Sequence, residues 1–121
     1  MKTRLYIFVA ALFCSVMLMA QSSASFIKKA QQQYGRNAYK EAFESLRNAE
    51  SALYGEERSS GKKMPEVRYS ITKERVQMYI RMRNSKRANE QLERLEEQAK
   101  NIGNDSINND LLYTQANVYY T

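Results

Sequence analysis

Glycine and proline are scarce in this chain, and their positions divide it into stretches with a helical pattern. The 121 residues include only four glycines and one proline. Between them, apolar residues recur at intervals of three and four, and the alternation of two that marks a strand is missing. The sequence therefore predicts an all-α protein with five helices, at residues 25–35, 38–54, 66–83, 85–102 and 108–120.

The same residues predict where the helices end. Gly55, Gly61 and Pro65 bracket a long loop at 55–66, and Gly103 opens a second loop. Gly55 and Gly103 are placed to form left-handed C-caps, and Pro65 fits a first helical turn. Short polar side chains that satisfy free amides are the preferred N-caps. The predicted N-caps are Asn37, Ser85, and Ser106 or Asn109.

Two of the helices should bury different numbers of faces. Over 85–102 the apolar residues step by 4, 3, 4 and 3 and form a single stripe: Ala88, Leu92, Leu95, Ala99 and Ile102. Over 66–83 there are two stripes, one of Val67, Ile71, Met78 and Met82, the other of Tyr69, Val76 and Ile80. A helix with two apolar stripes touches neighbours on two sides, as the inner helices of a repeat stack must.

Small and large apolar residues share one face of the stretch 37–53, namely Ala42, Leu46, Ala49 and Leu53. The preceding helix carries Ala30 at its centre, with Phe26 one turn earlier. This pattern resembles the tetratricopeptide repeat, in which small residues let the two helices of a hairpin pack closely. The resemblance implies antiparallel helical hairpins stacked as a short solenoid.

Weaker copies of the pattern follow along the chain. The second spans 65–102, with Val76 and Ala88 at the packing positions and Thr72 where a bulky residue is usual, and the third begins around Ala116. About two and a half repeats result. The spacings are 46 residues from Ala42 to Ala88 and 40 from Val76 to Ala116, against a usual period of about 34. The loop at 55–66 is expected to absorb the surplus in the first interval, and longer second helices the rest. The alternative is a closed bundle of five helices.

The first 24 residues have the pattern of a secretory signal peptide. Lys2 and Arg4 precede an apolar or small run from Leu5 to Ala20. This run is shorter than the roughly 20 residues that a membrane span needs. We expect cleavage after Ala24, with cleavage after Ala20 as the alternative. The mature repeat domain, 25–121, is then exported to the periplasm or the exterior, and membrane contact is limited to the signal segment.

The composition argues against an enzyme. The chain has no histidine, and its single cysteine, Cys14, lies in the signal segment. Ser-His or Cys-His catalysis and imidazole metal sites are therefore excluded, and no glycine-rich phosphate loop is present. No catalytic residue, cofactor or metal is predicted. The intermixed charges are typical of a solvated helix surface and not of a nucleic-acid interface.

The resemblance implies a non-enzymatic module that binds a protein or peptide. Arrays of this kind are also similar to the N-terminal sensing parts of bacterial envelope regulators that contain tetratricopeptide repeats, and the chain could supply such a sensor. The alternative is a compact exported bundle that binds a small apolar ligand.

The first helix of each hairpin should line the concave side of such a stack. Counting from Ala30, Val76 and Ala116, residues on the groove face follow from helical geometry. The predicted peptide-binding groove consists of Gln31, Tyr34, Lys73, Gln77, Arg81, Tyr113, Asn117 and Tyr120. Amides, cations and phenols suit an extended peptide, especially one with an acidic end.

The helix at 108–120 is apolar on more than one face, at residues 111, 112, 113, 116, 118, 119 and 120. A terminal solenoid helix with a polar outer face would not need a partner. We therefore expect further repeats or another chain to cover this helix, so that the domain is the front part of a longer array, truncated at its C-terminus.

Overall fold

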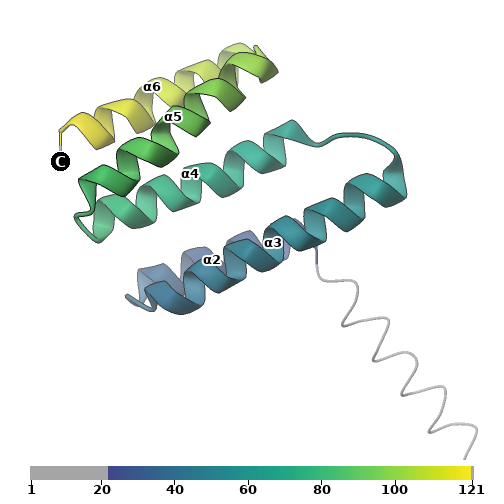
Figure 1. The fold of residues 1–121 in the computed structure, drawn as a ribbon, viewed down its shortest axis with the longest axis horizontal. Helices are drawn as coiled ribbons and strands as arrows, with labels where there is room; N and C mark the ends of the chain where they lie inside the picture. The colour runs from purple at the N-terminus through teal and green to yellow at the C-terminus, as the bar shows by residue number, and fades with distance from the viewer. Residues whose placement is uncertain (1–21, 121) are drawn as a thin grey trace, which may run out of the picture.

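Five helices form a layered all-α fold in the computed structural model, which describes residues 22–120 (Figure 1). They are α2 (Ser23–Gly35), α3 (Tyr39–Ser60), α4 (Pro65–Arg81), α5 (Ser85–Ile102) and α6 (Asp105–Tyr119). The all-α prediction is thereby confirmed. Most of the predicted signal segment, residues 1–21, lies outside the described residues. Within residues 22–120, no helix combines the length and the apolar character needed to cross a bilayer.

The prediction of a long loop at 55–66 is wrong, because α3 continues through Gly55 to Ser60. Gly55 is not a C-cap. That position belongs to Gly61, whose φ of 69° is left-handed and whose N–H donates to the carbonyl of Glu57. A glycine inside a helix costs only about 1 kcal/mol relative to alanine. The burial of Leu53, and the bonds that Glu57 accepts from the Met64 N–H and from Arg68, offset that cost.

The last helix begins three residues before the expected position, at Asp105. Its N-cap is Asn104, whose side-chain oxygen accepts the Ile107 N–H at 2.8 Å. Neither Ser106 nor Asn109 is therefore the cap. An asparagine directly after the Gly103 turn satisfies a free amide at once, so the second loop shortens to two residues.

The predicted N-caps of α3 and α5 are each displaced by one position. Asn84, not Ser85, caps α5 and accepts the Arg87 N–H at 3.2 Å. At α3 the cap position is Ala38, which makes no side-chain cap bond, while Asn37 lies in the turn with a left-handed φ of 62°. Asparagine tolerates that conformation better than most residues, so its role here is in the turn.

The hairpins α2–α3 and α4–α5 have the same turn. In the first, the Ala38 N–H donates to the Gln33 carbonyl at 2.8 Å, and in the second the Asn84 N–H donates to the Tyr79 carbonyl at 2.9 Å. The left-handed residues are Asn37 and Arg83, with φ of 62° and 57°. Each pair of equivalent residues is 46 positions apart, so the two hairpins repeat in backbone geometry as well as in sequence.

The difference between the two spacings, 46 and 40, has a structural cause. Helix α3 has 22 residues and α5 has 18, so α3 is one helical turn longer. The link from Ser60 to Pro65 is also two residues longer than the link from Ile102 to Asp105. The equivalent starts Pro65 and Asp105 are consequently 40 positions apart. Of the six additional residues in the first interval, four therefore belong to helix α3 and two to the link, whereas the sequence analysis expected them in the loop.

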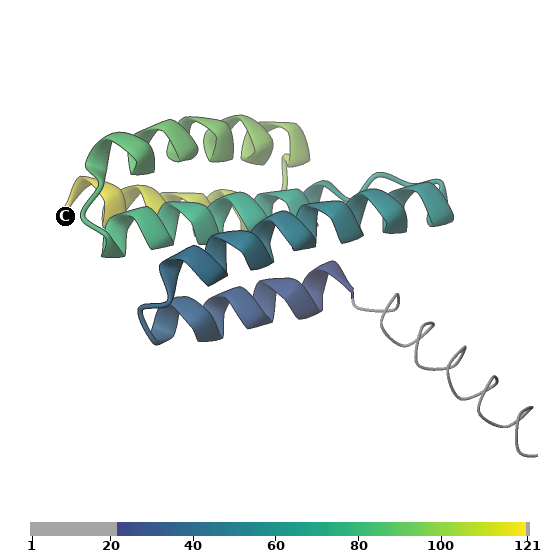
Figure 2. The ribbon, with the colours of Figure 1, turned by 60° about the horizontal axis from the view of Figure 1, so that its bottom comes forward.

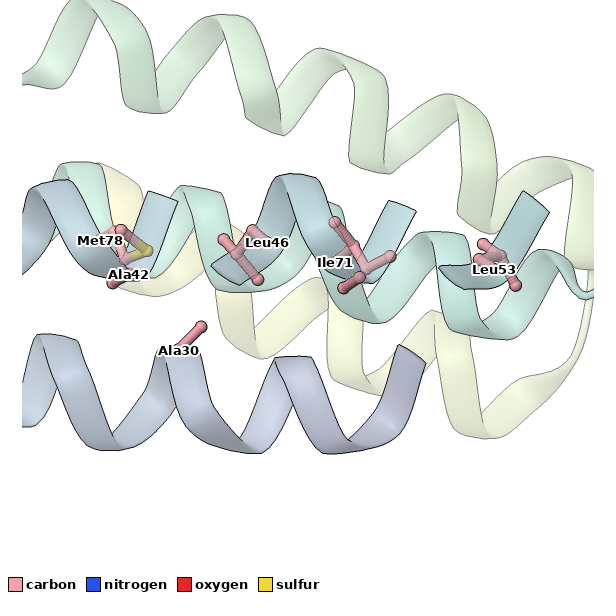
Figure 3. Close-up of a cluster of buried hydrophobic side chains, with 7 residues drawn as sticks. Ala30, Ala42, Leu46, Leu53, Ile71 and Met78 are labelled. Carbon is pink, nitrogen blue, oxygen red and sulfur yellow. The ribbon is translucent and has the colours of Figure 1, made fainter. Parts of the chain in front are cut away.

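The core consists of two clusters joined through α4. The first lies between α2, α3 and one face of α4 (Figure 3) and contains Ala30, Ala42, Leu46, Ala49, Leu53, Ile71 and Met78. The second lies between the other face of α4, α5 and α6 and contains Tyr69, Val76, Leu92, Leu95 and Ala99. These clusters confirm the two predicted stripes of 66–83 and the single stripe of 85–102. Met82 is the exception, because its side chain is exposed.

The helices pack in sequence order. Helix α2 packs against α3, α4 against α5, and α6 against α5, while α4 also contacts α2, α3 and α6. Among the described helices, α3 and α5 do not contact each other. In Figure 1, α4 lies between the pair α5 and α6 and the pair α2 and α3. In Figure 2, α5 and α2 lie at opposite sides of the molecule.

Candidate binding surface

Seven of the eight predicted groove residues lie on α2, α4 and α6, which are neighbours in that order, and Tyr120 is the C-cap residue of α6. These three helices therefore form one continuous surface. Two carboxylates bridge its two junctions, one between α2 and α4 and the other between α4 and α6. Each accepts a hydrogen bond from a tyrosine of the preceding helix.

Glu74 forms the junction between α2 and α4. Its carboxylate accepts hydrogen bonds from Gln31 Nε2 at 2.8 Å and from the Tyr34 hydroxyl at 2.9 Å. The Arg81 guanidinium lies 5.4 Å from the centre of the Tyr34 ring. Burial of the Tyr34 hydroxyl and the nearby Glu74 charge raise the pKa of Tyr34 to about 12. Three of the predicted groove residues thus belong to one network.

Asp110 forms the junction between α4 and α6. Its carboxylate accepts a hydrogen bond from the Tyr69 hydroxyl at 2.7 Å and an ion-paired bond from Lys73 Nζ at 2.6 Å. Burial of the Tyr69 hydroxyl, with the hydrogen bond to Asp110, raises the pKa of Tyr69 above its ordinary value. Lys73 is therefore tied to α6 and contributes less free charge to the surface than the sequence indicates.

The other predicted groove residues are Gln77, Tyr113, Asn117 and Tyr120. Gln77 and Asn117 are half-buried, and Asn117 has an interaction within the protein. Tyr113 and Tyr120 are 67% and 90% exposed. The two tyrosines contribute to a larger exposed apolar area on α6, which also includes Leu112 and Tyr119.

Two hollows accompany this surface. One, of about 690 Å³, lies between α2 and α4, and Gln31, Lys73, Lys28, Ile27 and Val67 are among its lining residues. Arg81 and Tyr120 line the second hollow, of about 670 Å³, which lies near the α4–α5 turn and the end of α6. Hollows of this size accommodate several side chains of a peptide or a small ligand.

The sequence reasoning missed Glu74, Asp110 and Tyr69. Glu74 could have been found, because it lies three residues after Ile71 and four before Met78, within an apolar stripe. A carboxylate at such a position must find partners when the helix packs. Asp110 has no comparable signal, since it lies near the start of a helix where acidic residues are common.

Among residues 22–120, no group of three or more histidine, cysteine, aspartate or glutamate residues is placed to hold a metal ion. Comparison of the chain with protein-family models, with curated proteins and with solved structures found no match.

Proposed function

We propose that the protein is an exported, non-enzymatic module of tetratricopeptide-repeat type that binds an extended peptide along α2, α4 and α6. The observation that carries this proposal is the order of contacts, in which the first helices of successive hairpins lie side by side and leave a hollow of about 690 Å³ between α2 and α4. Export rests on the sequence pattern of residues 1–24.

The repeat assignment is supported by the equivalence of the two hairpins. Their turns have the same backbone bonds, and Ala30 and Val76 occupy equivalent buried sites 46 positions apart. The two separate core clusters, with no contact between α3 and α5 among the described residues, favour a stack over a closed bundle. No observation favours the alternative of a bundle around a small apolar ligand, because the hollows on this surface have mixed linings.

The binding mode follows from which side chains are already engaged. Lys73 and Arg81 interact with Asp110 and Tyr34, so an acidic peptide end would have to compete with these contacts. Gln77 and Tyr113 offer amide and phenol groups on the same surface. We therefore place backbone hydrogen bonding and ring contacts before charge as the basis of affinity.

The exposed area on α6 supports a second contact. Leu112 and Tyr119 are 63% and 70% exposed. Their equivalents on α4, 40 positions earlier, are the buried Thr72 and the half-buried Tyr79. We propose that a further helix, from additional repeats or from another chain, packs on α6 as α5 packs on α4. A sensor role in an envelope regulator is consistent with such a continuation.

A peptide-display selection tests the groove. Binders selected from a random-peptide library should lose at least about tenfold in affinity, or about 1.4 kcal/mol, for the double variant Gln77→Ala with Tyr113→Ala. The matched control, Asn48→Ala with Tyr54→Ala, removes one exposed amide and one exposed phenol from α3, outside the predicted groove. Equal affinity of the selected peptides for the groove variant and the wild type would reject the proposed surface.

A further inference from the structure

A third hollow, independent of the proposed peptide surface, lies on the other side of α4. It has a volume of about 700 Å³ and is bounded by α3 and α5, with α4 between them. Leu53, Ile71 and Thr72 lie at its base and are almost fully buried. Helices α3 and α5 both pack on α4, and among the described residues no Cα of one lies within 8 Å of a Cα of the other, which leaves room for the hollow.

Four arginines line this hollow, and they come from three helices: Arg47 from α3, Arg68 and Arg75 from α4, and Arg94 from α5. The only acidic residue in the lining is Glu50. The lining therefore carries a clear excess of positive charge. The chain as a whole is more balanced, with 19 basic and 13 acidic residues, so the hollow is a local concentration of arginine.

Internal contacts hold two of these arginines in place. Arg75 pairs with Glu50, and its side chain is only 14% exposed. Arg68 pairs with Glu57 and lies 5.8 Å from the centre of the Tyr54 ring. Fixed guanidinium groups bind oxyanions well, because less side-chain entropy is lost on binding.

The other two arginines, Arg47 and Arg94, are available to bind a ligand. Arg47 and Arg94 are exposed and, among residues 22–120, form no ion pair with an acidic side chain. They lie on opposite walls of the hollow. Gln98, on the same wall as Arg94, has a buried Oε1 with no hydrogen-bond partner within the described part of the chain. Its amide can turn to present an N–H to a bound oxyanion instead.

We propose that this hollow is a binding site for a small molecule bearing two or more phosphate or carboxylate groups. Guanidinium groups recognise both kinds of anion through paired N–H···O bonds. Arginines on both walls favour a ligand whose anionic groups are separated enough to reach each side. A volume of about 700 Å³ is within the usual range for small-molecule sites.

Calorimetric titration of the protein produced from the full sequence tests this proposal, with pyrophosphate and citrate as the two probes. We expect saturable binding at one site for at least one probe, and the tighter probe identifies the preferred anionic group. Acetate, with a single charge, should bind at least about tenfold more weakly.

The double variant Arg47→Gln with Arg94→Gln should weaken the tighter probe by about tenfold or more, because two donors are lost. Both residues are exposed, so the fold should persist, and circular dichroism of the same sample verifies this. The matched control is Lys40→Gln with Lys100→Gln, which removes two exposed charges from α3 and α5 outside the lining.

A further variant separates charge from geometry. Arg75→Lys keeps the positive charge but loses the planar fork, and should weaken the tighter probe by a smaller factor than the double variant. Absence of saturable binding for both probes would overturn the proposal. Equal weakening in the arginine and lysine double variants would also overturn it, since net charge alone would then explain the binding.

Discussion

The hairpins α2–α3 and α4–α5 share a turn and a buried seam, but they differ in the length of their second helix. Helix α3 extends one turn beyond the equivalent end of α5. Glu56 is equivalent to Ile102, the last residue of α5, and Glu57 is the first residue of the extra turn. Each of the two glutamates holds the start of a neighbouring helix. Glu56 accepts hydrogen bonds from the Ser23 N–H at 2.7 Å and the Ser23 hydroxyl at 2.8 Å, at the start of α2.

Glu57 bonds in the same way to the start of α4. It accepts the Met64 N–H at 2.7 Å and pairs with Arg68. Carboxylates near helix N-termini are favourable, because the first amides are free and the helix dipole is positive there. Glu56 thus ties the two helices of the first hairpin together, and Glu57, in the added turn, ties the first hairpin to the second. Helix α5 ends without this turn, and α6 begins with its own cap, Asn104.

The largest expected effects come from equivalent core leucines. Leu46→Ala and Leu92→Ala alter residues 46 positions apart, one in each core cluster. Each should lower the free energy of unfolding by about 2–5 kcal/mol in urea denaturation. Leu112→Ala, at a 63% exposed site, should change it by no more than about 0.5 kcal/mol. A small loss at only one of the two leucines would show that the hairpins are not equivalent.

Removal of the charge on Glu57 tests the link between hairpins. The hydrogen bond from Met64 and the Arg68 charge hold the pKa of Glu57 below its ordinary value. A lowered pKa in the folded state gives stability that is present above the unfolded pKa and is lost as the pH falls through the folded one. The wild type should therefore lose stability on acidification, and Glu57→Gln should lose less.

Thermal denaturation between neutral pH and pH 3 measures this difference. Glu93→Gln, at an exposed position on α5, is the control and should follow the wild-type profile. Parallel profiles for the wild type and Glu57→Gln would show that Glu57 does not contribute through its charge.

The Tyr34–Glu74 bond should contribute less than the core. Tyr34→Phe removes one of two donors to a buried carboxylate, and should cost about 1–2 kcal/mol. The pKa of Tyr34 in the folded protein is raised to about 12. Its contribution to the free energy of unfolding is therefore fully present below the ordinary tyrosine pKa, and it declines as the pH rises from there towards 12. Tyr34→Phe should decline less over the same alkaline range. The exposed Tyr113→Phe should match the wild type, and equal behaviour of both variants would contradict the assignment.

The start of α2 sharpens the prediction of the cleavage site. Cleavage after Ala24 would remove the Ser22 cap and the buried Ser23, whereas cleavage after Ala20 keeps both. Loss of such a cap typically costs about 1 kcal/mol. If the proposed export takes place, N-terminal sequencing of the product should therefore begin at Gln21. A product that begins at Ser25 would show that the contacts of Ser23 with Glu56 do not exist in the mature protein.

The sequence predicts the helices and the buried faces well, because helical periodicity is local. The stripes of α4 and α5 and the small residues of the first hairpin are examples. The end of α3 could not be predicted in the same way. Gly55 carries a local signal for a helix end, but distant partners of Glu56 and Glu57 overrule it.

The helices that carry the predicted groove residues, α2, α4 and α6, are neighbours, but the contacts of these residues could not be predicted from the sequence. Whether Lys73 is free or paired depends on Asp110, which is 37 positions away and belongs to another helix. The arginine-lined hollow could not be predicted from the sequence for the same reason. Its four arginines are spread from position 47 to 94, and only the packing of α3 and α5 on α4 brings them together.

Methyl NOE spectroscopy tests the central claim, that two separate cores meet at the two faces of α4. The Ile71 and Met78 methyls should show cross-peaks to Leu46 and Leu53 and none to Leu92 or Leu95. Val76 should show cross-peaks to the leucines of α5. Cross-peaks between the leucines of α3 and those of α5 would contradict the account, because they would indicate a closed bundle with a single core.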